Sequence, residues 1–174
     1  LAKGGWHGTN TDVEGFLAPL GKRELWQGKK AVVIGCGGSA RAVVAGLQTL
    51  QLQMVHVIGR RAEVLNQFVA DLQQVDAPLH AITDQNPSLR RVIETADLVV
   101  NTTPVGMAQH GDPSAMPLGN ELWENLPHRA IVYDLIYTPR PTAWLAQAAD
   151  RGHLCFDGLE MLVQQGASAL RLWS

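Results

Sequence analysis

The sequence is poor in cysteine, nearly balanced in charge and free of long apolar runs. Its two cysteines, Cys36 and Cys155, are too few and too far apart for a disulfide framework or a zinc site. The six histidines are scattered without ligand spacing, so we expect no metal site. The formal net charge of −2 would attract neither nucleic acid nor an anionic membrane. No apolar run approaches the ~20 residues that span a bilayer, and no segment has the pattern of a secretory leader, so we expect a cytoplasmic domain.

What the sequence contains instead is an alternation of short apolar runs with amphipathic stretches. The apolar runs predict strands over 31–35, 53–59, 79–83 (the weakest signal), 97–104 (running into a Pro-stopped loop), 130–137 and 154–157. The amphipathic stretches predict helices over 39–50, 62–74, 87–96, 142–152 and 159–172. The Gly- and Pro-rich segment 107–119 predicts a loop. This alternation predicts an α/β fold, a doubly wound Rossmann-like domain with a mostly parallel sheet and helices on both faces.

The first 28 residues differ from the rest, because the helical stretch DVEGFLAPLG (12–21) has no strand before it. We therefore expect an inter-domain segment over 1–28 and a Rossmann domain over 29–174, whose closing helix 159–172 returns toward a further domain. The chain also starts without Met, directly on the polar loop GWHGTNTD (5–12). We interpret this start as a sign that the chain is a piece of a longer protein.

A glycine-rich turn, VVIGCGGSAR (32–41), joins the first predicted strand to the first predicted helix. A dinucleotide pyrophosphate must come close to backbone N–H groups at a helix N-terminus, where a Cβ would block it. The turn departs from G-x-G-x-x-G because Gly38 follows Gly37 directly, and Ala40 takes the third glycine's place, which the motif tolerates. The candidate cofactor-binding residues of the turn are Gly35, Gly37, Gly38 and Ser39. Arg41 either contacts phosphate or lies on the helix surface, and a tight turn without a ligand is the alternative for the whole motif.

The end of the second predicted strand indicates which dinucleotide this turn would bind. NAD-binding domains place an Asp or Glu there, about 20 residues after the glycines, to bind the ribose 2′-hydroxyl. This chain has Gly59, Arg60 and Arg61 instead, and guanidinium groups suit a 2′-phosphate. Glu63 lies inside the next predicted helix, where it favours the helix N-terminus. The pattern favours NADP over NAD, and a solvated surface pair of arginines is the alternative.

Taken in order, the motifs resemble those of the shikimate dehydrogenase family over nearly the whole chain. GTNTD (8–12) is similar to the family's Asn-Thr-Asp loop, GCGGSAR (35–41) to its glycine turn and VNTTPVGM (100–107) to its Asn-Thr/Ala-Thr-x-x-Gly-Met segment. DLIYTPRPT (134–142) is similar to the family's Asp-x-x-Tyr-x-Pro-x-x-Thr stretch, and DGLEMLVQQGASALRLW (157–173) to its closing helix. The resemblance implies reversible, NADPH-dependent reduction of 3-dehydroshikimate to shikimate, a small-molecule step of aromatic amino-acid and chorismate biosynthesis.

The resemblance also implies roles for individual residues. Asp12 would flank the substrate hydroxyl and form an acid/base couple with a lysine of the preceding domain, while Tyr137 and Gln165 would bind substrate. Arg60 matches the family's adenosine-phosphate arginine, and Arg61 would substitute for a second one. The residues implied to line the nicotinamide and diphosphate side of the cofactor are Asn101, Thr102, Thr103, Gly158 and Met161.

The largest departure from the family is an absent lysine. The family's lysine lies in an Asn-Val-Thr-x-Pro-x-Lys segment upstream of the Asp, and no lysine of this chain has that setting; Lys3 is a poor substitute. The resemblance therefore implies that an N-terminal substrate domain of the same enzyme completes the site, and that this chain alone is inactive or nearly so. Two alternatives stay open: a catalytically silent NADP-binding sensor or scaffold module, and an NAD-using quinate/shikimate dehydrogenase.

Several candidate residues also have purely structural interpretations. Asp12 precedes a helical stretch and would be an N-cap, whose side chain accepts an unpaired backbone N–H; an ionised cap is compatible with a catalytic role. Tyr137 would pack over the sheet edge, and backbone groups would satisfy Gln165. The closing-helix residues that we interpret most simply as core are Met161, Leu162, Leu170 and Leu172.

Overall fold

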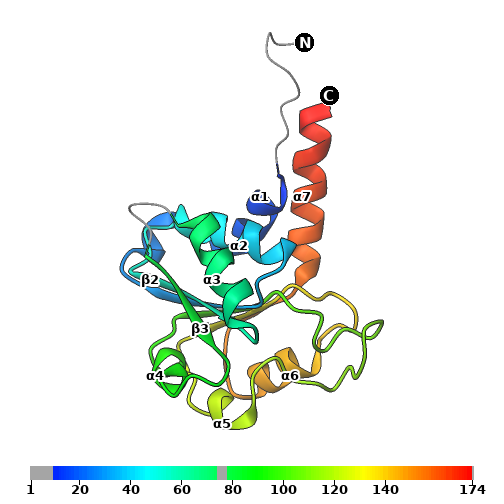
Figure 1. Cartoon of the computed structure of the whole chain (residues 1–174). Coiled ribbons are helices and arrows are strands. Elements are labelled where there is room, and N and C mark those ends of the chain that lie inside the picture. The colour runs from blue at the N-terminus through cyan, green and yellow to red at the C-terminus, as the bar shows by residue number, and fades with distance from the viewer. Residues whose placement is uncertain (1–9, 74–77, 174) are drawn as a thin grey trace.

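A six-stranded sheet forms the centre of the structure, a computed structural model that describes residues 10–73 and 78–173 (Figure 1). The strands are β1 (Lys30–Ile34), β2 (Met54–Gly59), β3 (Leu79–Thr83), β4 (Leu98–Asn101), β5 (Ile131–Asp134) and β6 (Cys155–Phe156). Their order is β3-β2-β1-β4-β5-β6, and each neighbouring pair is parallel. The predicted doubly wound fold is confirmed, and the weakly signalled strand is present as β3.

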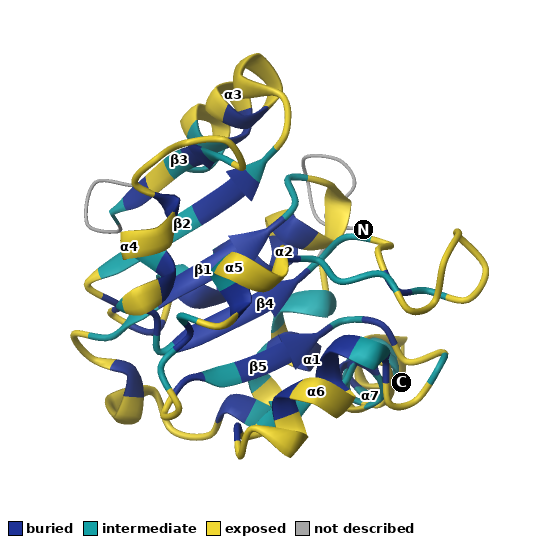
Figure 2. Cartoon of the chain, turned by 90° about the horizontal axis from the view of Figure 1, so that it is seen from below, coloured by how far each residue is buried: buried dark blue, intermediate teal, exposed yellow. Residues whose placement is uncertain are grey.

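Helices cover both faces of this sheet, which is why its central strands are continuous apolar runs (Figure 2). The helices are α1 (Asp12–Leu17), α2 (Gly38–Gln48), α3 (Ala62–Leu72), α4 (Leu89–Glu94), α5 (Asn120–Trp123), α6 (Ala143–Asp150) and α7 (Gly158–Trp173), with 3-10 turns η1 (Ala18–Leu20) and η2 (Arg23–Trp26). Val33 and Val57 pack on one face with α1, α2, α3 and the start of α7. Val32 and Ile58 point to the opposite face, which α4, α5 and α6 cover. Alternate residues of each strand thus supply two separate cores.

Two details of the elements differ from the sequence prediction. The segment 97–104 is strand only as far as Asn101, whose side-chain oxygen accepts a hydrogen bond from the N–H of Thr103 at 3.0 Å and turns the backbone. The short helix α5 was not predicted. It begins directly after the predicted loop 107–119 and buries Trp123 in the second core.

Helix α1 packs along α7 so closely that Gly15 has no room for a side chain. A Cβ at Gly15 would lie 2.5 Å from the carbonyl oxygen of Met161 and 3.0 Å from Cβ of Gln165. The next residue, Phe16, is fully buried and stacks on Tyr133 of β5, with 5.3 Å between the ring centroids. These contacts fix α1 to the sheet domain, although α1 contributes no strand.

The far end of α7 extends beyond the sheet (Figure 1), and its apolar side chains Leu170 and Leu172 are 65% and 60% exposed. The helix there has run past the elements that would cover them. Leu162, near the start of α7, is 41% exposed, so the interpretation of all three leucines as core is wrong. Met161, one turn from the start of α7, is buried as expected.

Two kinds of feature are absent from the part of the chain that the structure describes. No helix there combines the length and apolarity needed to cross a lipid bilayer. Within residues 10–73 and 78–173, no three His, Cys, Asp or Glu side chains gather as ligands of a metal ion. Cys36 and Cys155 are both free thiols.

Candidate functional site

The predicted cofactor residues lie at the carboxyl edge of the sheet, in the loops that follow β1, β2 and β4. The chain reverses its direction of winding between β1 and β4, since β2 and β3 lie on one side of that pair and β5 and β6 on the other. Doubly wound sheets bind ligands in the crevice outside the strand ends at this switch point. The topology therefore brings together turns that are far apart in the sequence.

The three glycines of the first turn have different reasons to be glycine. Gly35 has φ +106°, and a Cβ on it would lie 2.7 Å from Oγ1 of Thr102, so packing inside the chain requires it. Gly37 and Gly38 have ordinary backbone angles, and a Cβ on either would meet no atom within 4 Å. Nothing within the described chain requires these two glycines. They leave exposed backbone at the N-terminus of α2, where an anion could approach the N–H groups.

Ser39 and Arg41, which follow the glycines, differ in whether their side chains are available to bind a ligand. Ser39 is exposed in the first turn of α2. Arg41 is held away from the turn by α3, because its Nη2 donates to Oδ2 of Asp71 at 2.9 Å and its guanidinium lies over the Phe68 ring. Hydrogen bonds from Gln67 and Arg41 lower the pKa of Asp71. Of the two interpretations left open for Arg41, this geometry supports the surface one.

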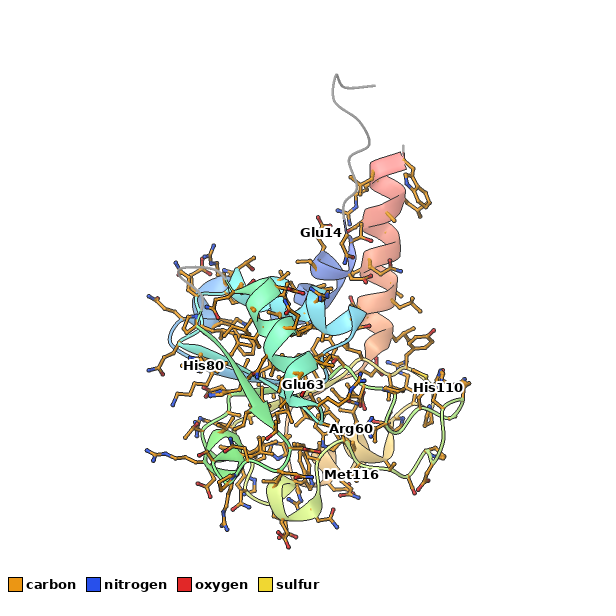
Figure 3. The ribbon with its side chains drawn as sticks, in the orientation of Figure 1. Glu14, Arg60, Glu63, His80, His110 and Met116 are labelled. Carbon is orange, nitrogen blue, oxygen red and sulfur yellow. The ribbon has the colours of Figure 1, made fainter. Side chains whose placement is uncertain are left out.

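The tip of β2 presents two guanidinium groups. Arg60 and Arg61 are exposed, and neither side chain forms a hydrogen bond or ion pair within residues 10–73 and 78–173. Glu63 is exposed in the first turn of α3 (Figure 3). Strand β2 ends at Gly59 without a carboxylate of its own. Two free cations beside open glycine backbone form a site suited to a nucleotide that carries an additional phosphate.

The loop after β4 is held by a buried polar network centred on Asp134. Oδ1 of Asp134 accepts from Nδ2 of Asn101 at 3.0 Å and from the N–H of Ile136 at 3.1 Å, and Oδ2 accepts from Oγ1 of Thr142 at 2.8 Å. Oδ1 of Asn101 in turn accepts from both the N–H and Oγ1 of Thr103. The Asn101 side chain is fully buried and satisfied by these bonds, so it shapes the loop from within.

Asp134 titrates abnormally because of its burial. Desolvation raises its pKa to about 6, and it outweighs the hydrogen bonds from Thr142, Ile136 and Asn101, which lower the pKa. Asp134 and Thr142 belong to a motif shared with the family, but the sequence alone assigned neither a role. Their function became visible only when the structure joined the ends of β4 and β5.

Thr102 fixes the same loop to the first strand. Its Oγ1 donates to the carbonyl oxygen of Ile34 at 2.7 Å, and its N–H donates to the same oxygen at 3.0 Å. Thr102 and Thr103 are both partly exposed at the switch point, next to Gly35. The predicted nicotinamide-side residues Asn101, Thr102 and Thr103 therefore border the glycine turn.

The start of α1, where Asp12 is the first helical residue, contacts Gln165 of α7 through Thr11. Thr11 occupies the N-cap position of α1, and Asp12 is the first helical residue, so the prediction of Asp12 as N-cap is wrong. With Asp12 as the N-cap, the helix would begin at Val13; instead it begins at Asp12, whose N–H donates to Oδ1 of Asn10 at 2.9 Å. Oγ1 of Thr11 donates to Oε1 of Gln165 at 3.4 Å, and Nε2 of Gln165 donates to the carbonyl oxygen of Leu162. The Asp12 carboxylate accepts no hydrogen bond from the described residues, and it remains available at the positive end of a helix.

Tyr137 lies beyond the end of β5 and is 46% exposed, so about half of its side chain is open to solvent and both its substrate-binding role and its packing at the sheet edge stay predictions. A pocket of about 240 Å³ lies beside it. The pocket is lined by Met107, Gln109, His110, Tyr137 and Thr138. The predicted loop 107–119 thus forms one wall of a cavity at the carboxyl edge, and His110 projects from it (Figure 3). Composition predicted the loop but gave no sign of this pocket.

Gly158 and Met161, the remaining nicotinamide-side candidates, are explained first by packing. A Cβ on Gly158 would lie 1.9 Å from the carbonyl oxygen of Leu135, so only glycine fits there. Met161 is 9% exposed and belongs to the core under α1. Both residues lie at the start of α7, which leaves the sheet edge at β6. A contact with cofactor stays a prediction for both.

The fold and this edge define the class of the protein: a doubly wound Rossmann domain whose first turn leaves glycine backbone open beside unpaired arginines. No family model matches the chain. Individual relatives are far more informative. The chain is homologous over nearly its whole length to proteins named shikimate dehydrogenase (NADP(+)).

Two relatives show the extent of the sequence similarity. The chain is 51% identical over 172 residues to shikimate dehydrogenase (NADP(+)) of Synechocystis sp. strain PCC 6803, which covers 97% of this chain and 58% of the relative. It is 45% identical over 171 residues to the protein of the same name from Trichormus variabilis, with the same two coverages of 97% and 58%. The chain therefore spans somewhat more than half the length of the curated relatives that it matches.

Solved structures give the same result. The chain has a TM-score of 0.76 and 36% identity to shikimate 5-dehydrogenase of Thermus thermophilus in complex with NADP(H) and shikimate, covering 96% of this chain and 57% of that one. It has a TM-score of 0.82 and 25% identity to the Listeria monocytogenes enzyme in complex with shikimate and NAD, covering 95% and 58%. These similarities do not favour a catalytically silent module.

Proposed function

We propose that this chain is the NADP-binding domain of a shikimate dehydrogenase. The complete enzyme would oxidise shikimate reversibly to 3-dehydroshikimate with NADP⁺. One observation carries the proposal: a chain 51% identical to a relative named shikimate dehydrogenase (NADP(+)) keeps open glycine backbone at its switch point.

The residues at the carboxyl edge would hold the cofactor in a defined order. The N–H groups around Gly37, Gly38 and Ser39 would bind the pyrophosphate at the N-terminus of α2. Arg60 and Arg61 would bind the 2′-phosphate, because no internal partner neutralises them within the described residues. The bound cofactor supplies a hydride acceptor or donor. The loop 101–103 would border its nicotinamide side, and Gly158 and Met161 would lie beside the carboxamide.

The residues at the crossing of α1 and α7 would serve the substrate. Gln165 would bind substrate hydroxyls, and Tyr137 would lie near the substrate ring and the nicotinamide. A lysine of the preceding domain, implied by the family resemblance, would exchange a proton with the substrate oxygen. The carboxylate of Asp12 beside that lysine would lower the free energy of its ammonium form, which suits proton donation to a developing alkoxide.

An N-terminal substrate domain would complete the site and cover part of α7. Support comes from the length of the relatives, of which this chain spans 58%, and from the exposed apolar end of α7. We place the complete enzyme in the cytoplasm, where its small-molecule substrates and NADPH are available.

The central test uses the complete gene product that contains this chain. Shikimate oxidation is measured with NADP⁺ and with NAD⁺ for the wild type, for Arg60→Ala and for Arg61→Ala. Loss of a charge-assisted contact with phosphate should lower the preference for NADP⁺ at least about tenfold. Arg90→Ala is the control, since Arg90 is exposed on α4 and is paired with Glu94.

The outcomes separate the alternatives. Equal use of both cofactors, or an unchanged preference in Arg60→Ala, would exclude the assignment of the arginines. Faster turnover of quinate with NAD⁺ would identify the quinate/shikimate alternative. NADPH binding without turnover of either substrate would identify a silent module.

The isolated 174-residue chain should behave as a binding domain. It should bind NADPH with micromolar affinity and a strong preference over NADH, and turn over little or no shikimate. Isothermal titration calorimetry measures the first property and a cofactor absorbance assay the second. Full activity of the isolated chain would disprove the need for a further domain.

A further inference from the structure

Two loops at the carboxyl edge are joined by an ion pair that the roles assigned above do not use. Nε of Arg140, in the loop between β5 and α6, donates to Oδ2 of Asp157, the residue before α7. The first loop carries Tyr137, and α7 carries Gln165. The pair therefore connects the elements that hold the two proposed substrate contacts.

Asp157 makes this connection rigid on the side of α7. Its second oxygen, Oδ1, accepts from the N–H of Leu159 at 3.0 Å, as an N-cap does for a helix. The N–H of Gly158 donates to the carbonyl oxygen of Ile136 at 3.2 Å, and Gly158 has no space for a side chain beside Leu135. The start of α7 thus rests directly on the backbone that leads to Tyr137.

The pair is poorly placed to contribute much stability. The Arg140 side chain is 58% exposed, and exposed ion pairs contribute little to folding. The ion pair instead restrains the position of the loop, because Arg140 lies only three residues beyond Tyr137 and contacts Asp157. Without the pair, the segment from Tyr137 to Arg140 would lose its side-chain link to α7.

We propose that Arg140 and Asp157 are positioning residues that set Tyr137 relative to Gln165. This inference rests on the proposed function, because it gives the two residues a purpose in substrate binding. Neither residue touches the reacting atoms. The ion pair holds the β5–α6 loop against the start of α7, so that the distance between Tyr137 and Gln165 stays fixed.

The chain contains a matched control for this pair. Nε of Arg129 donates to Oδ1 of Asp97 at 3.1 Å, and the two side chains are 64% and 17% exposed, against 58% and 16% for Arg140 and Asp157. Arg129 and Asp97 precede β5 and β4, so they lie at the opposite edge of the sheet. Loss of either pair should cost similar stability, but only one lies near the proposed site.

The test measures steady-state kinetics of the complete gene product with Arg140→Ala, Arg140→Lys, Asp157→Asn and Arg129→Ala. Asp157→Asn keeps an oxygen for the N–H of Leu159 and removes the charge. We expect kcat/KM for shikimate to fall about tenfold in Arg140→Ala and Asp157→Asn, since small displacements of positioning groups are costly in rate. KM for NADP⁺ should stay unchanged, and Arg140→Lys should recover part of the loss. The double variant that combines Arg140→Ala with Asp157→Asn should be no worse than either single variant.

Three results would overturn the proposal: activity within twofold of wild type in Arg140→Ala, an equal loss in Arg129→Ala, or multiplicative losses in the double variant. A second measurement is independent of activity. Hydrogen exchange of the Gly158 and Leu159 amides should speed up in Arg140→Ala and stay unchanged in Arg129→Ala; unchanged exchange in Arg140→Ala would also overturn it. If wild type does not oxidise shikimate, the proposed function fails, and the exchange result still decides whether the ion pair holds the two loops.

Discussion

At the residue scale, the glycines of the carboxyl edge divide into those that packing requires and those that it does not. Gly37→Ala should change the free energy of unfolding by less than about 1 kcal/mol, because its backbone angles are ordinary and the space for a Cβ is open. The same methyl group should lower NADPH affinity at least about tenfold, since it occupies the approach to the N–H groups. Urea unfolding and calorimetric titration measure the two effects.

Gly158→Ala is the contrasting variant. Its Cβ would lie 1.9 Å from the Leu135 carbonyl oxygen, so the loop must move, at a cost of about 1–3 kcal/mol in the free energy of unfolding. If Gly37→Ala were the more destabilised of the two variants, this would contradict the finding that the first turn has space for a Cβ at Gly37.

Asp134 gives the free energy of unfolding a pH dependence of definite sign. Its folded pKa of about 6 lies above the ordinary value of 3.8, because burial disfavours the carboxylate. The stabilisation is therefore fully present below the unfolded pKa and is lost as pH rises through the folded one. A shift of this size corresponds to about 3 kcal/mol in total, of which about 2 kcal/mol is lost between pH 4 and pH 6.5. Chemical denaturation at several pH values measures it.

The control is Asp134→Asn, which cannot titrate and should lack this decline. His56 acts in the opposite direction below pH 6.5, because burial first and then His80 and Lys30 lower its pKa. The contribution of Asp134 is therefore obtained as the difference between wild type and Asp134→Asn. Identical pH profiles of the two proteins would contradict the prediction.

Single residues were predictable from the sequence where the reason was local. The glycine turn and the arginines at the tip of β2 follow from neighbours within a few positions. The pairing of Arg41 with Asp71 and of Asn101 with Asp134 joins residues 30 and 33 positions apart, and no local pattern encodes it. The position of Asp12 in the first turn, rather than at the cap, depends on Asn10 accepting its N–H.

At the scale of elements, the contact between α1 and α7 depends on one glycine. Gly15→Ala should destabilise the chain by about 1–3 kcal/mol, because its Cβ would overlap the Met161 carbonyl oxygen at 2.5 Å. Gly166→Ala, on α7 itself, is the matched control, since a Cβ there meets nothing within 4 Å and alanine favours the helix by up to about 1 kcal/mol. Thermal and urea unfolding measure both variants, and equal stability of the two would contradict the tight packing.

Elements were predictable where the hydrophobic period was long enough to be recognised. The strands alternate with helices as the pattern indicated, because burial on both faces produces continuous apolar runs. Helix α5 spans only Asn120–Trp123, too short for an amphipathic repeat, and its helical form depends on the burial of Trp123. The close packing of α1 on α7 was not visible, since a glycine at a helix contact looks like any other glycine in a sequence.

At the scale of the whole molecule, the end of α7 tests the proposed further domain. Trp173 is 82% exposed and Leu170 65% in this chain. In the isolated chain, iodide should quench Trp173 fluorescence readily, as obtained by difference from Trp173→Phe. In the complete gene product the same residue should be protected if a substrate domain covers it. Equal quenching in both proteins would show that this end of the helix stays uncovered.

The contact at Gly15 also has a mechanical consequence. Helices α1 and α7 pack against each other at Gly15 with no room for a side chain, and both are fixed to the sheet. The two helices, with Thr11 and Gln165, therefore form one rigid unit. If the complete protein opens and closes around its substrate, the hinge must lie outside the unit formed by α1 and α7. Asp12 and Gln165 would then move together, and the distance between them would stay constant as the protein opens and closes.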